Sequence, residues 1–422
     1  MTHSLKEGSN APGFTGRGNH ASRSLSTLAA IMCSFMLFGL VACQSWFRIE
    51  VTAPAESLIP LEMAGIPRPD DDLDQGSLRR AVQQSLAYLD RLPADRTFPY
   101  GAEQIPVAHV RETLQALLRI LDQQWPPEEF ARQMSEEFVW FQAAGRDASR
   151  TVLFTGYYAP MLEGRLEAEG EFRFPLYRVP PDVVEIDLGA FRSSLHGERL
   201  VGRVDGRKLI PYYSRAEIDG QGRLQGRDSE LVWLKDPVDR FFLHIQGSGQ
   251  IVLEDGQRLN VNYAAANGHA YRSIGKILID EGAIPREEMS MQAIRAYLKA
   301  HPERVDELFF ANPSYVFFRV VKEGPLGNIE VPITPGRSIA TDSRLFPKGG
   351  LAFIHTQRPV VDPEGRILEW RPFSRFVLNQ DTGGSILGAG RVDLYCGFGT
   401  EAEVTAGHLK HDGKLYFLLK KP

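Results

Sequence analysis

Two aspartates near the end of the chain have the residue type and surroundings that proton transfer needs. Asp381 opens segment 381–386, which reads Asp-Thr-Gly-Gly-Ser-Ile, and Asp393 follows twelve positions later between Arg-Val and Leu-Tyr. An aspartate among apolar residues is expected on a strand that faces a buried site. Burial raises a carboxyl pKa, and a carboxylic acid that is neutral near pH 7 can protonate a glycosidic oxygen. A buried structural aspartate that only accepts backbone N–H groups is an equally good interpretation of these residues.

Three further segments carry groups that could bind a sugar. Residues 155–158 read Thr-Gly-Tyr-Tyr, and aromatic rings cover the C–H face of a pyranose while hydroxyls bond its OH groups; core tyrosines at a strand edge are the alternative. Polar and apolar residues alternate over 244–249, which predicts that Gln246 and Ser248 share one face of a strand. Residues 267–275 place polar groups near a helix start, although these last two segments could be surface loops. The candidate substrate-binding residues are Thr155, Gly156, Tyr157, Tyr158, Gln246, Ser248, Asn267, Tyr271 and Ser273.

Three more candidates belong to the neighbourhood of the two aspartates. Asp342 heads a turn-like stretch, where an Asx turn or a cap is favoured over direct proton transfer. Gly383 and Gly384 follow Asp381, and their backbone could approach a sugar closely because no Cβ intervenes.

Several other chemistries are disfavoured. An aspartic protease needs two acids that share a proton, but the chain has one Asp-Thr-Gly tripeptide. His408 and His411 have no third ligand nearby, and Gly407 argues against a helix there, so no metal site is predicted. The net charge is −5, without a long basic run, which argues against a nucleic-acid partner.

The first part of the chain has the features of an export signal. Arginines precede an apolar run that ends in Leu-Val-Ala-Cys at Cys43, which resembles the lipobox of bacterial lipoproteins. We therefore expect residues 1–43 to be a lipoprotein signal and Cys43 to be lipidated; an uncleaved signal anchor is the alternative. Residues 44–76 are rich in proline and acids and are predicted to be a flexible tether. Cys396 would be the one cysteine left besides Cys43 and is expected to be a small buried hydrophobe.

The rest of the chain divides into helical and β-rich parts. Amphipathic helices are predicted over residues 77–89, 107–121 and 127–141. Strands with glycine and proline turns follow from residue 151. Predicted strands include 172–179, 208–213, 231–233, 241–245, 250–253, 315–319, 376–378 and 415–418. A helical island is predicted over 270–281, 285–298 and from 302.

These motifs together resemble the membrane-bound lytic murein transglycosylase A family, over about residues 151–420. The segments that carry the resemblance are 154–158, 239–249, 267–275, 312–318 and the Asp381/Asp393 region. Asp342, Asp381 and Asp393 also resemble the three aspartates of the 3D domain that ends this family. The resemblance implies a mainly β fold with N-terminal helices. A double-psi β-barrel domain (77–159 and 322–422, with the 3D domain at about 330–422) would hold a smaller inserted β-domain (160–321), with the substrate groove between them.

The resemblance also implies an activity. The family cleaves the β-1,4 bond between N-acetylmuramic acid and N-acetylglucosamine in peptidoglycan and forms a 1,6-anhydro ring, without a cofactor. The catalytic acid would be Asp393, with Asp381 as its acidic partner. Gln44 after Cys43 implies, by similarity to sorted lipoproteins, an anchor on the periplasmic face of the outer membrane. Cell-wall synthesis or hydrolase complexes are possible partners. A hydrolytic muramidase that uses both aspartates, and a non-catalytic peptidoglycan-binding lipoprotein, are the alternatives.

Overall fold

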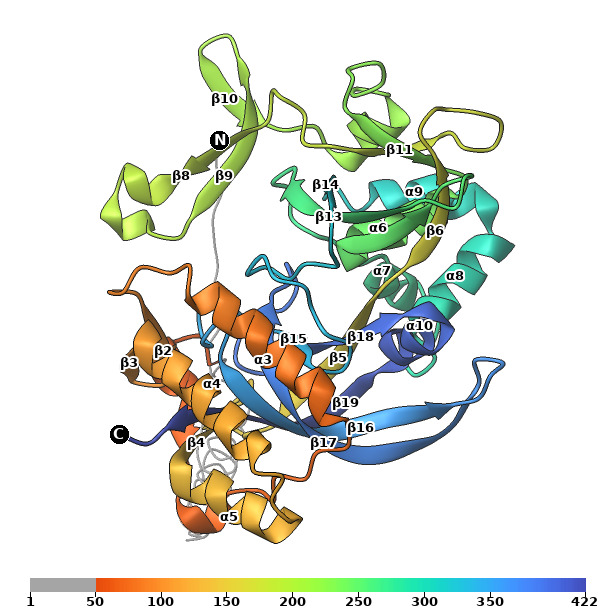
Figure 1. The fold of residues 1–422 in the computed structure, drawn as a ribbon. Helices are drawn as coiled ribbons and strands as arrows, with labels where there is room; N and C mark the ends of the chain where they lie inside the picture. The colour runs from red at the N-terminus through yellow and green to blue at the C-terminus, as the bar shows by residue number, and fades with distance from the viewer. Residues whose placement is uncertain (1–50) are drawn as a thin grey trace, which may run out of the picture. The chain divides into compact units, whose positions relative to one another are not determined.

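A closed barrel of six strands forms the centre of the fold (Figure 1). The computed structural model describes residues 51–422, so residues 1–50, including the predicted signal and Cys43, lie outside the described part. The strand order is β19-β16-β17-β15-β18-β5, and β5 pairs with β19 to close the ring. The barrel strands are β5 (Val152–Ala159), β15 (Ser338–Ala340), β16 (Leu351–Val361), β17 (Ile367–Asp381), β18 (Arg391–Phe398) and β19 (Lys410–Lys420).

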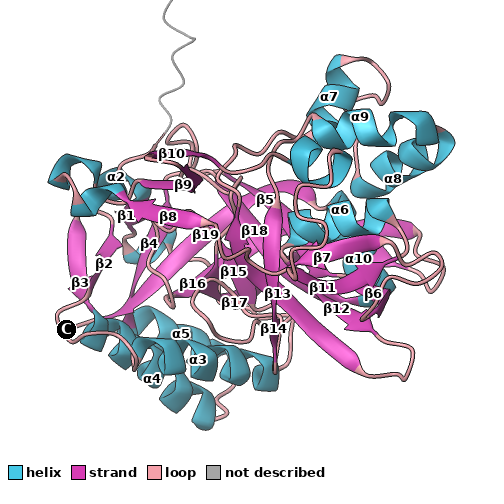
Figure 2. Cartoon of the chain, turned by 90° about the horizontal axis from the view of Figure 1, so that it is seen from above, coloured by secondary structure: helices cyan, strands magenta, loops and turns pink. Residues whose placement is uncertain are grey.

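N-terminal elements cover this barrel and extend its sheet. Strand β4 (Phe138–Ala143) pairs with β19, and β1 (Leu58–Pro60) pairs with β4. The apolar faces of α3, α4 and α5 contribute to the same large core as the barrel strands, and these helices lie together on one side of the strands (Figure 2). The remaining N-terminal elements are α2 (Pro54–Ser57), α3 (Gln75–Leu89), β2 (Thr97–Tyr100), β3 (Glu103–Pro106), α4 (Val107–Asp122) and α5 (Pro127–Glu137).

The predicted helices 77–89 and 107–121 are confirmed as α3 and α4, whereas the predicted helix 127–141 is too long. Asp74 caps α3, because its carboxylate accepts a hydrogen bond from the Ser77 N–H. Helix α5 ends at Glu137, and Phe138 and Phe141 lie on β4. The run from Phe138 is aromatic and β-branched, and this composition suits a strand.

The predicted tether is wrong for residues 51–76, which belong to the fold. Strand β1 lies in the barrel sheet. Asp71 pairs with Arg337 at 2.6 Å, and Asp72 pairs with Arg375 at 2.8 Å. Arg337 is fully buried, and a buried cation needs a counter-charge. The acidic run therefore neutralises buried arginines of the barrel and does not form a solvated spacer.

A second sheet is formed by the chain between β5 and β15. Its order is β14-β13-β12-β6-β11-β7, and helices α6 to α9 build a core of their own beside it. Its strands are β6 (Met161–Arg165), β7 (Phe174–Tyr177), β11 (Glu230–Leu234), β12 (Ser248–Val252), β13 (Arg258–Ala266) and β14 (Val316–Val321). A small separate sheet contains β8 (Val184–Asp187), β9 (Arg199–Asp205) and β10 (Lys208–Pro211). The helices are α6 (Pro237–Gln246), α7 (Ile274–Asp280), α8 (Met291–Ala300) and α9 (Val305–Phe310).

Two predictions in this region are wrong, and so is one near the C-terminus. Residues 241–245 are helix α6, which begins with the Asp236 cap and Pro237 and ends at Gly247 with φ 77°. Gln246 and Ser248 therefore do not share a strand. The helix predicted from 285 begins only at Met291, because Ser290 caps it there. Near the C-terminus, Gly407 lies inside helix α10 (Gly399–His408). None of the helices among residues 51–422 is both long enough and apolar enough to cross a bilayer.

Candidate active site

The short strand β15 brings the two aspartates together. Ala340 is paired with Asp381 of β17 on one side and with Asp393 of β18 on the other. On the far side of β18, Asp393 is paired with Thr155 of β5. Paired residues of neighbouring strands point to the same face of a sheet. One face of the barrel wall therefore carries both carboxyl groups and the Thr155 hydroxyl.

Asp393 has the environment of a weak acid. Its Oδ1 accepts a hydrogen bond from the Thr155 hydroxyl at 2.6 Å, and its Oδ2 has no hydrogen-bond partner in the described part of the chain. Burial raises the pKa of Asp393 to about 6, although the Thr155 hydroxyl and Arg391 act to lower it. Asp381 raises this pKa less than burial does. Asp393 thus combines a raised pKa with a carboxyl oxygen that is free to contact a ligand.

Asp381 is held much more firmly. Its Oδ2 accepts a hydrogen bond from the Tyr157 hydroxyl at 2.7 Å. Its Oδ1 accepts from the backbone N–H of Asn328 at 2.9 Å and of Thr382 at 2.8 Å. Burial raises the pKa of Asp381, and these donors together with Lys348 oppose the rise. Three donors favour the ionised form, so the two aspartates have different environments.

Lys348 is a part of the site that the sequence analysis missed. Its buried ammonium donates to the backbone oxygen of Asp381 and, at 3.2 Å, to Asn379 Oδ1. Burial lowers the pKa of Lys348 to about 8, and Asp381 and Asp342 act to raise it. A lysine within the apolar and glycine-rich segment 345–350 was the signal that could have identified it. Lys348 fixes the end of β17, and with it the backbone of Asp381.

Four of the predicted sugar-binding residues are buried for structural reasons. Tyr158 packs beneath α10 against Ala402 and Ala406. The Asn267 side chain donates to the backbone oxygens of Tyr213 and Pro313. The other two of these four residues, Ser248 and Asp342, are also buried.

The buried carboxylate of Asp342 forms the turn predicted for it. It accepts hydrogen bonds from the Arg344 side chain and backbone and from the Gly388 N–H. Burial alone would raise the pKa of Asp342, but these bonds lower it overall. This arrangement is an Asx turn that supports the loop before β18.

Of the remaining candidates, Tyr157 is also buried. The others are at least partly exposed but do not all face the carboxyl groups. Gly156, Gln246, Tyr271 and Ser273 line a cavity of about 500 Å³ that is also bounded by α10. The Gln246 side chain accepts a hydrogen bond from the Tyr158 N–H at 3.1 Å and so links α6 to β5. Shortly after Asp381, Gly383 is partly exposed. Gly384 is exposed, and open space lies where a Cβ of Gly384 would be. The site therefore comprises Asp393, Asp381, Thr155 and Tyr157, and the two glycines lie at its edge.

Comparisons with known proteins give a family for this arrangement. Residues 153–319 match the model described as the MltA specific insert domain, and residues 337–419 match the 3D domain. The membrane-bound lytic murein transglycosylase A of Escherichia coli K12 is 37% identical over 285 residues, which cover 67% of this chain and 69% of that protein. The Vibrio cholerae protein of the same name is 34% identical, over 66% of this chain and 68% of its own length. The chain belongs to this family.

Solved structures agree with that assignment. A membrane-bound lytic murein transglycosylase from Agrobacterium tumefaciens has 31% identity and a TM-score of 0.71, and the match covers 86% of this chain and 98% of that one. The Escherichia coli MltA solved with bound chitohexaose has 28% identity and a TM-score of 0.65, with 90% and 98% covered. This protein is thus a lytic murein transglycosylase with a mainly β fold.

Proposed function

We propose that this transglycosylase cleaves the β-1,4 bond between N-acetylmuramic acid and N-acetylglucosamine without water and leaves a 1,6-anhydro end. The observation that carries the proposal is the contrast between the carboxyl groups. Asp393 has a pKa of about 6 and a free oxygen, whereas Asp381 accepts three hydrogen bonds. A hydrolase of the usual kind needs a second carboxylate that is free to activate water or attack the sugar. Asp381 is too fully occupied for that role, which favours one residue that acts twice.

The reaction then takes two proton transfers at Asp393. The acid first donates its proton to the glycosidic oxygen, so that the N-acetylglucosamine leaves with its hydroxyl restored. The Asp393 carboxylate next accepts the proton of the muramyl C6 hydroxyl, while that oxygen bonds to the anomeric carbon. The nucleophile belongs to the substrate, so ring closure has the advantage of an intramolecular reaction. Asp393 ends protonated, as it began.

The neighbouring groups have supporting roles. The Thr155 hydroxyl orients Asp393, and Tyr157 holds Asp381. An ionised Asp381 would stabilise positive charge that develops at the anomeric carbon. Gly383 and Gly384 would let the glycan approach the backbone closely. The glycan bound by the Escherichia coli relative supports a chain of sugars as the ligand.

We also propose the finer architecture and location of the family for this chain. The parallel pairs β15–β17 and β5–β18 support a double-psi barrel, and the position of the second sheet between β5 and β15 supports an inserted domain. Lipidation of Cys43 would anchor the protein to the outer membrane, facing the periplasm. The name of the relatives, membrane-bound, supports membrane association.

Mass spectrometry of digested murein sacculi tests the reaction. We expect the natural protein to release fragments with 1,6-anhydro ends and Asp393→Asn to release none. Asp362→Asn is the matched control, because Asp362 pairs with Arg366 in a surface turn, and it should keep full activity. Free reducing ends would show a hydrolytic muramidase, and cleavage by Asp393→Asn would refute the role of Asp393.

A further inference from the structure

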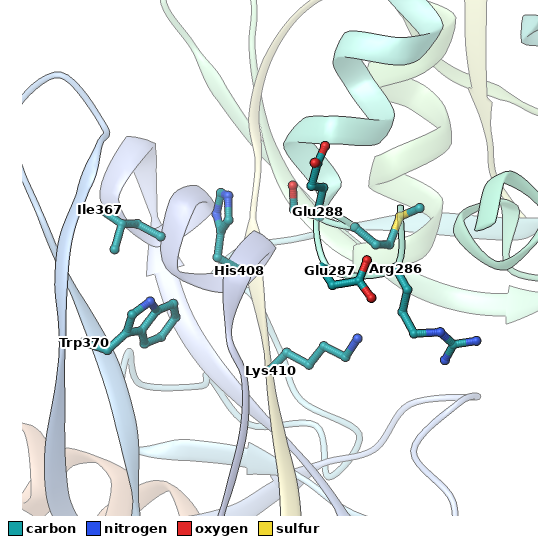
Figure 3. A pocket seen from close by; sticks show the side chains of 9 residues that line it. Arg286, Glu287, Glu288, Ile367, Trp370, His408 and Lys410 are labelled. Carbon is teal, nitrogen blue, oxygen red and sulfur yellow. The ribbon is translucent and has the colours of Figure 1, made fainter. Parts of the chain in front are cut away.

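A second cavity, of about 630 Å³, lies where three parts of the chain meet (Figure 3). The segment between α7 and α8 provides Arg286, Glu287 and Glu288. The β16–β17 hairpin provides Trp370, and the end of α10 with the start of β19 provides His408 and Lys410. We propose that this cavity binds the peptide stem of the peptidoglycan strand that is being cut. This inference rests on the proposed function, since it concerns the same substrate.

The charges in the cavity are available to a ligand. The side chains of Arg286, Glu287, Glu288 and Lys410 are exposed, and none has a hydrogen bond or an ion pair to another residue between 51 and 422. In Figure 3 the Lys410 side chain extends toward the segment that carries Arg286 and Glu287. Cations and anions that do not neutralise one another suit a ligand with both carboxylate and ammonium groups. The peptide stems of peptidoglycan carry carboxylates, and stems with a diamino acid also carry an ammonium group.

The apolar wall suits the rest of such a ligand. Trp370 is partly buried, and its ring lies 4.1 Å from the ring of His411, centroid to centroid. Ile367 and Met289 also line the cavity. An aromatic wall with a few convergent charged groups is the usual composition of a ligand site, and alanyl methyl groups of a stem would pack against it.

The cavity lies within reach of the reacting bond. Lys410 is paired with Thr155, which is paired on its other side with Asp393. These three residues lie on neighbouring strands and point to one face. Strands are spaced by about 4.8 Å, so Lys410 starts about 10 Å from Asp393. A peptide extends about 3.4 Å per residue, so a stem of three residues attached to the muramyl sugar at Asp393 spans that distance.

The walls of the cavity are held together in the absence of ligand. The Gln292 side chain at the start of α8 donates to the backbone oxygen of Glu403 in α10 at 3.1 Å. Arg295 of α8 pairs with Asp239 at 2.6 Å and approaches Glu403 at 3.8 Å. These contacts fix α8 against α10, so the site does not need to be assembled when the stem binds. Preorganisation of this kind lowers the cost of binding.

Kinetics on two matched substrates test the proposal. The two substrates are glycan strands that carry their stems and glycan strands whose stems an amidase has removed. The natural protein, Arg286→Gln, Lys410→Gln and the double variant are each assayed on both substrates. We expect the single changes to raise KM for stem-bearing strands about threefold each, as exposed charge contacts of this kind do, and to leave KM for stripped strands unchanged. Lys299→Gln, which removes an exposed lysine at the far end of α8, is the control and should alter neither.

Two kinetic outcomes would overturn the proposal. One is a natural protein with the same kcat/KM for stem-bearing and stripped strands. The other is a set of variants in which kcat/KM falls equally for both substrates, which would make the cavity a subsite for sugar. Calorimetric binding of a soluble muramyl tripeptide to Asp393→Asn, with and without Lys410→Gln, gives a readout without turnover, and equal affinities would also refute the stem site. The comparison is between substrates, so it is independent of whether the products have anhydro or reducing ends. Failure of the stem site is therefore distinguishable from failure of the proposed reaction.

Discussion

Replacing Asp393 by asparagine should remove activity and make the protein more stable at alkaline pH. The pKa of Asp393 rises from 3.8 to about 6 on folding, because burial disfavours its charge. The folded state therefore favours the protonated form, and the stability gained from the neutral carboxyl is lost as pH rises through about 6. A shift of about two units corresponds to about 3 kcal/mol. Asparagine keeps the shape, can still accept from Thr155, and has no charge to lose.

The expected size of the effect can be measured by thermal unfolding. A folded unit of this size has an unfolding entropy of about 0.8 kcal/mol per kelvin, so 3 kcal/mol raises Tm by about 4 °C at pH 8. At pH 4 natural protein and variant should be nearly equal, because the natural carboxyl is then largely protonated when folded.

Asp342→Asn is a control of opposite sign for this experiment. The pKa of Asp342 is lowered overall in the folded protein, so its carboxylate adds stability above its unfolded pKa and loses it as pH falls. This variant should therefore be less stable than the natural protein at pH 8, and the difference should shrink in acid. An Asp393→Asn protein that is equally stable or less stable than the natural one at pH 8 would refute the reasoning that Asp393 is a buried weak acid.

Two further changes test how the site and the N-terminal segment are held. Thr155→Val removes the 2.6 Å hydrogen bond to Asp393, which should raise the pKa of Asp393 further. The alkaline limb of the pH profile of kcat should then shift to higher pH, and kcat should fall about tenfold. Thr155→Ser should restore the pH profile and kcat, and an alkaline limb that does not shift in Thr155→Val would contradict the role of Thr155. Arg337→Met leaves Asp71 without its buried partner and should lower the free energy of unfolding, measured in urea, by about 3–5 kcal/mol. Lys276→Met, which breaks an exposed pair with Asp280, should lower it by at most about 1 kcal/mol. A small loss for Arg337→Met would mean that residues 70–74 add little to the fold.

Local patterns in the sequence predicted the long helices well. The apolar repeats over 77–89 and 107–121 became α3 and α4 with bounds that differ by at most two residues. The short apolar run 241–245 was ambiguous, because a few apolar residues fit a buried strand or a buried helix. The Asp236-Pro237 start and the Gly247 stop were the signals that distinguish a helix there.

Contacts between distant segments were beyond the reach of local patterns. Asp71 and Arg337 are 266 positions apart, and an acidic run next to prolines has the composition of a tether until the buried arginines are known. The resemblance to a family singled out Asp381 and Asp393, but nothing local shows that β15 lies between their strands or that Lys348 holds the backbone of Asp381. Strand register decides these relations, and register depends on the whole barrel.

The pairing of β5 with both β18 and β19 has a consequence for biogenesis. β19 lies at the C-terminal end of the described chain, and it completes the ring through its pairing with β5. Until those last residues have docked, the strand that carries Thr155 keeps one unpaired edge, which is a template for aggregation. A prematurely terminated chain should therefore be cleared by proteases as a misfolded product and should not persist as a partly working enzyme able to damage the wall.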